Sequence, residues 1–476
     1  MKARKSTINC KKEENILSAL RRNGVTIKAF CNGRHTCGKC RVRIDSNDEA
    51  LLNCLSEPGE AEKSLLSQDE INEGVRLACD CFFVKEVDSV AIEVLDELEN
   101  GAPVLTETDN AVSVNKGQAY NMKTFAAIDI GTTTIALKLI SDGKEITTLT
   151  RQNSQCSYGA DVISRSEASI GGANEELKRC LIDDINKLLD ECGTSEIEHI
   201  IIAANTTIVH LLKGYPLGEM VSYPFRPYYS GWHKEMFETT DNRQIPMTIL
   251  PNLSAYIGAD IIAGLYYCDF SSLNKVSLFI DLGTNGEMAI GNRDRILTAS
   301  AAAGPAFEGT KINVATDVVK CMSELRKKGI IDENGMLKDP YFDSGYPYIC
   351  RNNTPVIIGQ RDIRDIQMAK SAIRSGIMLL IKNYGIDIED IDKVFLAGGM
   401  GHSLDVASAV HIGLLPGELE NKVVFVGNTS LAGCIKYGLM EYDDALVDKV
   451  LKVCGEITLS NEADFSNMYY SYMLFD

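Results

Sequence analysis

The sequence lacks any uninterrupted apolar run of about 18 residues, the length that a membrane-spanning helix needs. It also lacks a basic and apolar leader at its N-terminus, so we expect no secretion signal. Positive charge is scarce: 48 Lys and Arg face 66 Asp and Glu, for a formal net charge of -18. Nucleic acids and anionic membranes would be repelled by this negative excess. The sequence therefore predicts a cytoplasmic protein that binds neither.

Histidine is sparse as well: there are six, none in a metal-binding spacing such as H-E-x-x-H, and we assign none a role. Cysteine is abundant, with 15 residues, which we expect to be free thiols or ligands rather than disulfides. Eight of them lie singly between Cys156 and Cys454 and are expected to be mostly small buried apolar residues. The other seven crowd between Cys10 and Cys81, which indicates a different use there.

The densest cysteine segment is "CNGRHTCGKC", residues 31–40, with the spacing C-x5-C-x2-C. From Gly33 it also reads G-x-x-x-x-G-K, but the next residue is Cys40, where a phosphate-binding loop needs a hydroxyl for Mg²⁺. A strand-like run follows, where that loop requires a helix. Gly33 and Gly38 permit the sharp turns that gather thiolates around a metal. The pattern favours a metal centre over buried thiols, and over zinc, which more often uses paired C-x2-C units.

Around this loop the sequence predicts a compact α/β domain. Residues 6–10 and 40–44 read as strands, residues 13–24 as a helix, and the apolar run 75–84 has β character. We place the domain at residues 1–96.

An acidic stretch follows, since residues 86–110 contain eight carboxylates and no Lys or Arg. Like charges repel and there is little to bury, so we interpret residues 97–123 as an acidic linker. A second unit, residues 124–476, begins where apolar strands return.

The second unit contains an internal sequence repeat. "TFAAIDIGTTTIALKLI" from residue 124 and "VSLFIDLGTNGEMAIG" from residue 276 align at an offset of 152 residues, pairing Asp129 with Asp281 and Gly131 with Gly283. "IEHIIIAANTT" and "IDKVFLAGGMG" form a second pair of strands that end in small-residue loops. This duplication predicts an α/β architecture with two similar lobes and a cleft between them.

A D-x-G-T turn offers backbone N–H groups and hydroxyls to phosphate and a carboxylate to hydrated Mg²⁺. Two such turns together with "FLAGGMG" resemble the superfamily of acetate and sugar kinases, Hsp70-type chaperones and actin. The resemblance implies an actin-like two-lobed ATPase that binds ATP, with Asp129 and Asp281 positioning Mg²⁺ and the attacking water. The implied nucleotide-binding residues are Gly131, Thr132 and Thr133 in the first hairpin, Gly283 and Thr284 in the second, and Gly398, Gly399 and Gly401 in an adenosine loop.

The cysteine loop resembles the ferredoxin-type [2Fe-2S] loop, in a C-x5-C-x2-C form. This implies a β-grasp ferredoxin-like domain whose cluster ligands are Cys31, Cys37, Cys40 and a fourth cysteine from a distant strand. "RLAC" resembles the fourth position, so we choose Cys79; Cys81 and Cys54 remain competitors.

The two units together resemble the reductive activators of corrinoid-dependent methyltransferases. Shared motifs run along nearly the whole chain: "CNGRHTCGKC", "RLACDC", "AAIDIGTTT", "YGADVISR", "NTTIVHLL", "YIGADIIAG", "FIDLGTNGE", "AAAGPAFEG", "RDIRDIQMAKSAI" and "FLAGGMG". The resemblance implies ATP-dependent reduction of an inactive Co(II) corrinoid protein to Co(I), in an anaerobe, with one electron from the cluster. A low-potential donor would feed the cluster, and the linker would let the ferredoxin domain swing.

One departure and several alternatives stand beside this resemblance. Larger relatives carry an extra domain between ferredoxin and ATPase, for which 476 residues leave little room, so homodimer formation stays open. The alternatives are a small-molecule kinase with a redox-sensing ferredoxin domain, an activator of another low-potential enzyme such as a radical dehydratase, and an ATP-gated binding module.

Three further residues are Asp161, Arg165 and Glu308. Asp161 and Arg165 are four apart on an expected helix, which favours a surface i,i+4 pair. Glu308, between two glycines, fits either a loop lining the cleft or a plain turn.

Overall fold

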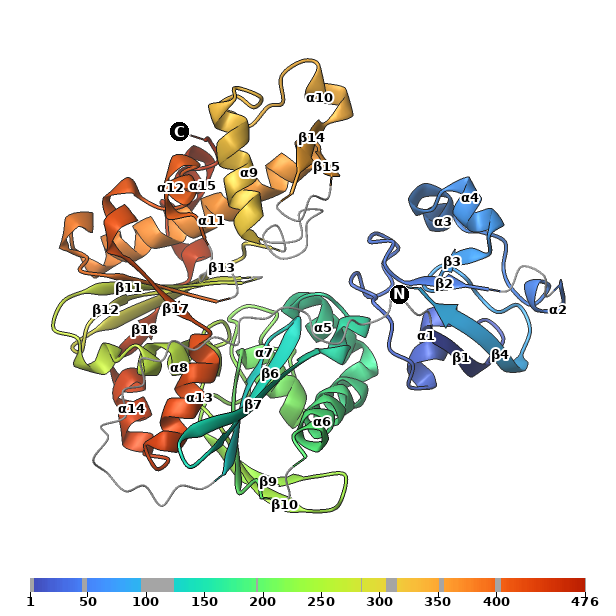
Figure 1. The fold of residues 1–476 in the computed structure, drawn as a ribbon, viewed down its shortest axis with the longest axis horizontal. Helices are drawn as coiled ribbons and strands as arrows, with labels where there is room; N and C mark the ends of the chain where they lie inside the picture. Colours follow the sequence, from blue (N-terminus) through green and yellow to red (C-terminus); the bar gives the residue numbers. More distant parts are fainter. Residues whose placement is uncertain are drawn as a thin grey trace.

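The computed structural model describes residues 4–44, 49–95, 124–193, 196–283, 285–304, 315–350, 355–398 and 404–475. It comprises an N-terminal domain and two larger lobes, and Figure 1 shows the N-terminal domain beside the first lobe. The expected linker, residues 97–123, lies outside the described part of the chain. No helix in the ranges given above is both long enough and apolar enough to cross a membrane.

The N-terminal domain is a four-stranded antiparallel sheet in the order β1-β4-β2-β3, with α1 packed against it. Helix α1 starts where the side chain of Asn15 accepts a hydrogen bond from the N–H of Ser18 at 2.8 Å, and it buries Ile16, Leu17, Ala19 and Leu20. The elements are β1 (Arg4–Cys10), α1 (Ile16–Arg22), β2 (Arg41–Arg43), α2 (Glu49–Leu52), α3 (Glu60–Leu65), α4 (Gln68–Asn72), β3 (Val75–Leu77) and β4 (Val87–Val94).

Two expectations for this domain need correction. The predicted β run 75–84 is a strand only from Val75 to Leu77, after which the chain turns. Strand β4 lies within the acidic stretch and was missed. Its side chains alternate, with Val90, Ile92 and Val94 buried and Asp88 exposed, so the carboxylates do not prevent it from packing on the core.

The first lobe is a six-stranded sheet in the order β7-β6-β5-β8-β10-β9. Strands β5, β6 and β7 form antiparallel pairs, whereas β8 lies parallel to both β5 and β10. Its elements are β5 (Phe125–Ile130), β6 (Thr134–Ser141), β7 (Lys144–Gln152), η1 (Ser154–Ser157), α5 (Val162–Ala168), η2 (Ser169–Ala173), α6 (Asn174–Glu191), β8 (His199–Ala204), α7 (Thr206–Lys213), β9 (His233–Glu238) and β10 (Gln244–Ile249).

The second lobe repeats this plan in the order β17-β16-β11-β12-β13-β18. Its β11-β12-β13 meander is antiparallel and β16 lies parallel to β11 and β17, which matches five strands of the first lobe, β7-β6-β5-β8-β10. The sixth strands differ, because β9 pairs antiparallel with β10, whereas β18 pairs parallel with β13 at the other edge. The register agrees too: Asp129 lies opposite Ala203, and Asp281 lies opposite Ala397. The predicted duplication and the two-lobed α/β fold are confirmed.

The remaining elements belong to the second lobe and to the layer between the sheets. They are α8 (Ala259–Tyr267), η3 (Phe270–Ser272), β11 (Ser277–Leu282), β12 (Gly286–Gly291), β13 (Ile296–Ala301), α9 (Ala315–Lys327), α10 (Tyr341–Ser344), β14 (Tyr346–Ile349), β15 (Pro355–Ile358), α11 (Gln360–Tyr384), η5 (Ile388–Asp390), β16 (Val394–Ala397), α12 (Val406–His411), η6 (Gly417–Lys422), β17 (Val423–Gly427), α13 (Thr429–Leu439), α14 (Asp444–Val453), β18 (Cys454–Glu456), η7 (Leu459–Asn461) and α15 (Phe465–Ser471).

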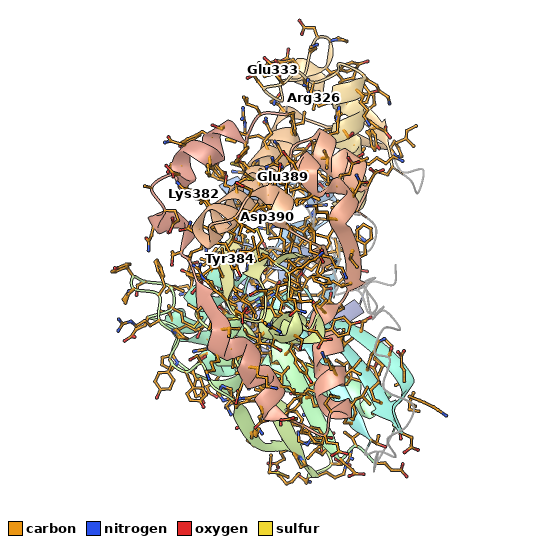
Figure 2. All side chains as sticks on the ribbon, turned by 90° about the vertical axis from the view of Figure 1, so that its left-hand side faces the viewer. Arg326, Glu333, Lys382, Tyr384, Glu389 and Asp390 are labelled. Carbon is orange, nitrogen blue, oxygen red and sulfur yellow. The ribbon has the colours of Figure 1, made fainter. Side chains whose placement is uncertain are left out.

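Helices α8 and α13 join the lobes, because one core cluster contains both of them and side chains of both large sheets. The helices touch closely at Gly433, where a Cβ would lie 2.4 Å from the carbonyl oxygen of Ala263. The end of the chain packs on the second lobe: Arg326 donates to the carbonyl of Phe475 at 2.9 Å, and the N–H of Phe475 donates to Glu333 at 2.8 Å. Figure 2 shows Arg326 and Glu333 at one end of the molecule, away from the lobe junction.

Candidate functional site

An open cleft of about 930 Å³ lies where strands of both lobes end. Seven of the predicted nucleotide-site residues line it, from both hairpins and from the loop after β16. They are Asp129, Gly131, Thr132, Thr133, Asp281, Gly283 and Gly398. Thr284, Gly399 and Gly401, together with Glu308, lie outside the described residues. The fold thus brings together residues up to 269 positions apart, as the duplication predicted.

Asp129, near the end of β5, is held by residues at the start of α13. The amide of Asn428 donates to its Oδ2 at 2.8 Å and the hydroxyl of Ser430 donates to its Oδ1 at 2.7 Å. Burial raises the pKa of Asp129, while the hydrogen bonds from Ser430 and Asn428 oppose that rise. Asn428 also caps α13, accepting from the N–H of Leu431 at 2.8 Å, so the carboxylate is tied to a fixed helix end.

Two further carboxylates, Asp260 and Glu287, line the cleft and were not singled out from the sequence. Burial, followed by the charge of Asp129, raises the pKa of Asp260 to about 7. Burial, then Asp260 and Asp281, raises the pKa of Glu287 well above its usual value. Both residues sit inside quoted motifs, "YIGADIIAG" and "FIDLGTNGE", which was the available signal.

The second hairpin is not a copy of the first. Glu287 lies directly opposite Asp281 on the neighbouring strand, whereas Ala136 lies opposite Asp129. The second hairpin therefore carries two facing carboxylates where the first carries one. This pair favours the binding of a cation over that of a bare phosphate group.

Gly398 makes room for Asp281. It has φ +85°, and a Cβ there would lie 2.3 Å from Asp281 Oδ1 and 2.8 Å from the carbonyl oxygen of Leu282. A side chain at this position would displace the carboxylate. The space at Gly398 is therefore used by the acidic group itself, a role that we did not expect for this glycine.

The first hairpin is braced from behind by the segment that follows β7. Asn153 donates through its N–H to the carbonyl of Thr133 and through Nδ2 to that of Gly131, both at 2.9 Å. Arg165 donates to the carbonyl of Thr132 and, at 3.0 Å, to that of Gly159. Arg165 is completely buried, and burial lowers its pKa to about 10.

The interpretation of Asp161 and Arg165 as a surface pair is therefore wrong. Asp161 caps α5, accepting from the N–H of Ser164 at 2.7 Å, while Arg165 points inward to backbone carbonyls. The expected helix is present, but it begins after Asp161, and the spacing gave no information on which of its faces is buried.

The cysteine loop places its four predicted ligands in two contacting pairs. The sulfurs of Cys31 and Cys37 are within hydrogen-bond distance of each other, as are those of Cys40 and Cys79. Cys40 and Cys79 are buried, whereas Cys31 and Cys37 are half-buried. The backbone supports this pairing, because the N–H of Ala78 donates to the carbonyl of Cys40 at 2.8 Å.

The loop stabilises anionic sulfur at Cys31 and Cys40, whereas burial raises the pKa of Cys37 to about 11. Burial alone would raise the pKa of Cys31, but backbone hydrogen bonds from Thr36 and Cys37 outweigh it and lower the pKa to about 7. The hydrogen bond from Cys79 lowers the pKa of Cys40, and the same bond raises that of Cys79. Amide groups thus point at the sulfurs, which is the environment that a thiolate-bound cluster requires.

The two competing cysteines lie elsewhere in the domain. Burial raises the pKa of Cys81 to about 12, and its neighbours are Arg76, Glu62 and Ser56 rather than the other cysteines. Cys54 accepts a backbone hydrogen bond at its carbonyl from Val84 at 2.8 Å, in a separate turn. Within the described ranges, no three His, Cys, Asp or Glu side chains converge on one point as a single metal ion would need. A two-iron centre shares its four thiolates between its irons, so two pairs are compatible with it.

An ion pair fixes the strand that precedes Cys79. Arg76 donates to the two carboxylate oxygens of Glu62 at 2.9 and 2.8 Å, and the N–H of Leu77 donates to Glu62 at 2.7 Å. Glu62 is fully buried. Because the pair is enclosed and completely hydrogen-bonded, it holds β3, and with it Cys79, in one position against β2.

Three family models match successive parts of the chain. The model of the 2Fe-2S iron-sulfur cluster binding domain matches residues 2–84. The model of the RACo middle region matches residues 125–272, and that of the C-terminal domain of RACo, the ASKHA domain, matches residues 275–317 and 314–476.

Curated relatives and one solved structure extend the comparison to whole chains. The corrinoid activation enzyme RamQ of Eubacterium limosum is 24% identical over 566 positions, covering 95% of this chain and 94% of the relative. The [Co(II) methylated amine-specific corrinoid protein] reductase of Methanosarcina barkeri is 24% identical over 420 positions, covering 72% and 75%. The structure of a reductive activator for corrinoid, iron-sulfur protein superimposes with a TM-score of 0.68 at 24% identity, covering 98% of this chain and 96% of that one. The first alignment is longer than the 476 residues of this chain, so that relative has residues that this chain lacks.

Proposed function

Because the chain belongs to the family of reductive activators of corrinoid proteins, as its motifs indicated, we propose that it reduces an inactive Co(II) corrinoid protein to Co(I) in an ATP-dependent reaction. The observation that carries the proposal is that a paired four-cysteine loop and a two-hairpin acidic cleft occur in one chain. Neither part alone distinguishes an activator from a kinase or a ferredoxin. Their combination favours an activator, because it places an electron-transfer centre and a nucleotide cleft in one chain.

The electron-carrying group would be a [2Fe-2S] cluster held by Cys31, Cys37, Cys40 and Cys79, and the loop fits this group through its backbone donors. When bound, such a cluster passes single electrons at low potential, near about -400 mV in plant-type ferredoxins. The protein residues contribute in two ways. Buried Cys40 and Cys79 keep water from one side of the centre, and half-buried Cys31 and Cys37 leave the other side near the surface.

The nucleotide would bind across the cleft, with its phosphates on the two hairpins. Thr132 and Thr133 would face the phosphates on one side, at the turn where the N–H of Gly131 donates to the carbonyl of Thr134 at 2.9 Å. Gly283 lines the other side, together with Gly398, which makes room for Asp281. We assign Mg²⁺ to Asp129 and Asp281, because a triphosphate cannot approach this many carboxylates without a cation between them. Asp260 and Glu287 lie in the same cleft, and we propose that they orient water there.

ATP is required because the reduction of Co(II) is energetically uphill from a ferredoxin-like donor. Binding of nucleotide by both lobes favours their closed arrangement, since only that arrangement uses both hairpins at once. A closed form that binds the corrinoid protein differently can change the environment of the cobalt, and with it the cobalt potential. The ATPase thus supplies free energy, while the cysteine loop supplies the electron.

The remaining parts of the proposal concern the surroundings of the protein. A low-potential donor refills the cysteine centre, and the formal charge of -18 makes a basic face on that donor and on the corrinoid protein favourable. We retain a cytoplasmic location and homodimer formation as proposals.

The proposal is tested by mixing anaerobic protein with Co(II) corrinoid proteins, reductant, Mg²⁺ and ATP while the visible spectrum is recorded. We expect the Co(I) band to appear only when ATP is present. Phosphorylation of a sugar or acid without any Co(I) band would replace this function with that of a small-molecule kinase. Nucleotide-dependent complex formation without reduction would indicate a binding module.

A further inference from the structure

The N-terminal domain rests on one segment of the first lobe, residues 153–167, which runs from the end of β7 through η1 into α5 (Figure 1). The N–H of Ala29 donates to the carbonyl of Cys156 at 3.4 Å, and the N–H of Ala160 donates to the carbonyl of Phe30 at 3.0 Å. The chain just before Cys31 therefore lies along this segment, joined to it by backbone hydrogen bonds.

Two arginines hold the cysteine loop itself to the same segment. Arg21 donates to Asn32 at 3.0 Å and to the carbonyl of Ser157, and its guanidinium lies 4.4 Å from the centre of the Tyr158 ring. Arg34, inside the loop, forms an exposed ion pair with Glu167. Contacts from α1, from the loop and from the residues before it thus converge on about fifteen residues of the first lobe.

The opposite side of this segment supports the first phosphate hairpin. The carbonyls of Gly131, Thr132 and Thr133 all accept hydrogen bonds from it, two from Asn153 and one from Arg165. One short segment therefore contacts the cysteine loop on one side and the nucleotide site on the other.

These contacts have a physical consequence for phosphate binding. Hydrogen bonds polarise the peptide units in which they occur, so a carbonyl that accepts makes the N–H of the same unit a stronger donor. The carbonyls of Gly131 and Thr132 share their units with the N–H groups of Thr132 and Thr133. Donation from Asn153 and Arg165 therefore strengthens the groups that the hairpin offers to phosphate.

We propose that residues 153–167 couple nucleotide binding at the first hairpin to docking of the cysteine loop, so that each strengthens the other. Asn153 and Arg165 act as positioning residues. The reciprocity follows from thermodynamic linkage between two sites on one element. The inference rests on the proposed function in that ATP occupies the hairpin. It adds that the ATP-bound form holds the cysteine centre more firmly on the first lobe than the nucleotide-free form does.

The docking contact offers a surface variant, at Glu167, that touches neither the four predicted cluster cysteines nor the first hairpin. Glu167→Arg places two positive charges side by side and should weaken docking without altering the hairpin. By linkage we expect binding of a non-hydrolysable ATP analogue to weaken about 3-fold. The charge swap Arg34→Glu with Glu167→Arg restores opposite charges and should restore the affinity.

The decisive experiment is hydrogen exchange on the full-length anaerobic protein, with and without the analogue and Mg²⁺, after calorimetry has established binding. We expect exchange of the amides of Ala29 and Ala160 to slow about 3-fold or more with the analogue, and we expect Arg165→Lys to lose that response. Bound analogue with unchanged exchange at both amides overturns the coupling alone. An analogue that does not bind overturns the coupling and the proposed function together.

Discussion

Replacing Gly398 with alanine should disable the nucleotide cleft, and Gly385 provides a matched control. Both glycines have positive φ, +85° for Gly398 and +86° for Gly385. A Cβ on Gly398 would lie 2.3 Å from Asp281 Oδ1, whereas a Cβ on Gly385 would meet no atom within 4 Å. The two substitutions therefore impose the same backbone strain but differ in the clash.

The size of each effect follows from this geometry. Left-handed backbone costs an L-residue about 1–2 kcal/mol, so both variants should lose about that much free energy of unfolding. In Gly398→Ala the carboxylate of Asp281 must also move by about 1 Å, and a displacement of that size at a reacting site costs up to about 100-fold. We expect Mg²⁺-ATP to bind 10- to 100-fold more weakly, which corresponds to about 1.4–2.7 kcal/mol.

Calorimetric titration with an ATP analogue and Mg²⁺, together with denaturant unfolding of both variants, measures these terms separately. Gly385→Ala should retain the affinity of the original protein. If Gly398→Ala binds the analogue as Gly385→Ala does, Asp281 has no role in nucleotide binding and the reasoning is refuted.

Three further outcomes test the two sites and the fold. Cys79→Ser should abolish iron and acid-labile sulfide in anaerobically prepared protein, whereas Cys81→Ser should retain both. The reason is that Cys79 contacts Cys40, while Cys81 faces Arg76. A full complement of iron in the Cys79→Ser variant would reverse the ligand choice. Ser430→Ala removes the 2.7 Å hydrogen bond to ionised Asp129, which raises the pKa of Asp129 and should move the acidic limb of the pH profile of ATP hydrolysis to higher pH. Thr429→Val is its control, since the buried hydroxyl of Thr429 has no hydrogen-bond partner among the described residues, and equal profiles for both variants would contradict the role of Ser430. Burial, then the charge of Lys213, lowers the pKa of His233 from 6.5 to about 4, so folding favours the neutral ring. The stability that this group contributes is present above pH 6.5 and is lost as the pH falls towards 4. His233→Leu should therefore flatten the dependence of the unfolding temperature on pH between these values, and an unaltered pH dependence would exclude the effect.

The two hairpins could be predicted from sequence because their signal is local. Each consists of an apolar strand, an Asp, a Gly turn and a second apolar strand within about 16 residues, and the two copies reinforce each other. The common register of Asp129 with Ala203 and of Asp281 with Ala397 shows that the repeated pattern reflects a repeated structure. The pairing of Cys79 with Cys40 likewise agrees with the position expected for a ferredoxin-type loop.

What could not be predicted depends on contacts between distant parts of the chain. Asn428 and Ser430, which hold Asp129, are 299 and 301 residues away from it, and nothing in either segment indicates the other. Arg165 reads as a surface residue because its helix is short and polar, but it fills a buried position against the first hairpin. Asp260 lies in the first turn of α8, where an acidic residue is ordinary, so the motif around it did not indicate that it faces the cleft.

The central claim, that ATP enables this chain to pass an electron from its cysteine centre to a corrinoid, is tested most directly by a single-turnover measurement. The protein is reduced beforehand, freed of excess reductant and mixed with a molar excess of Co(II) corrinoid protein, with or without Mg²⁺-ATP. The account predicts about one Co(I) formed per reduced centre with ATP, almost none without it, and almost none with Cys79→Ser. Equal Co(I) in the presence and absence of ATP, or none under either condition with an authentic corrinoid partner, would contradict it.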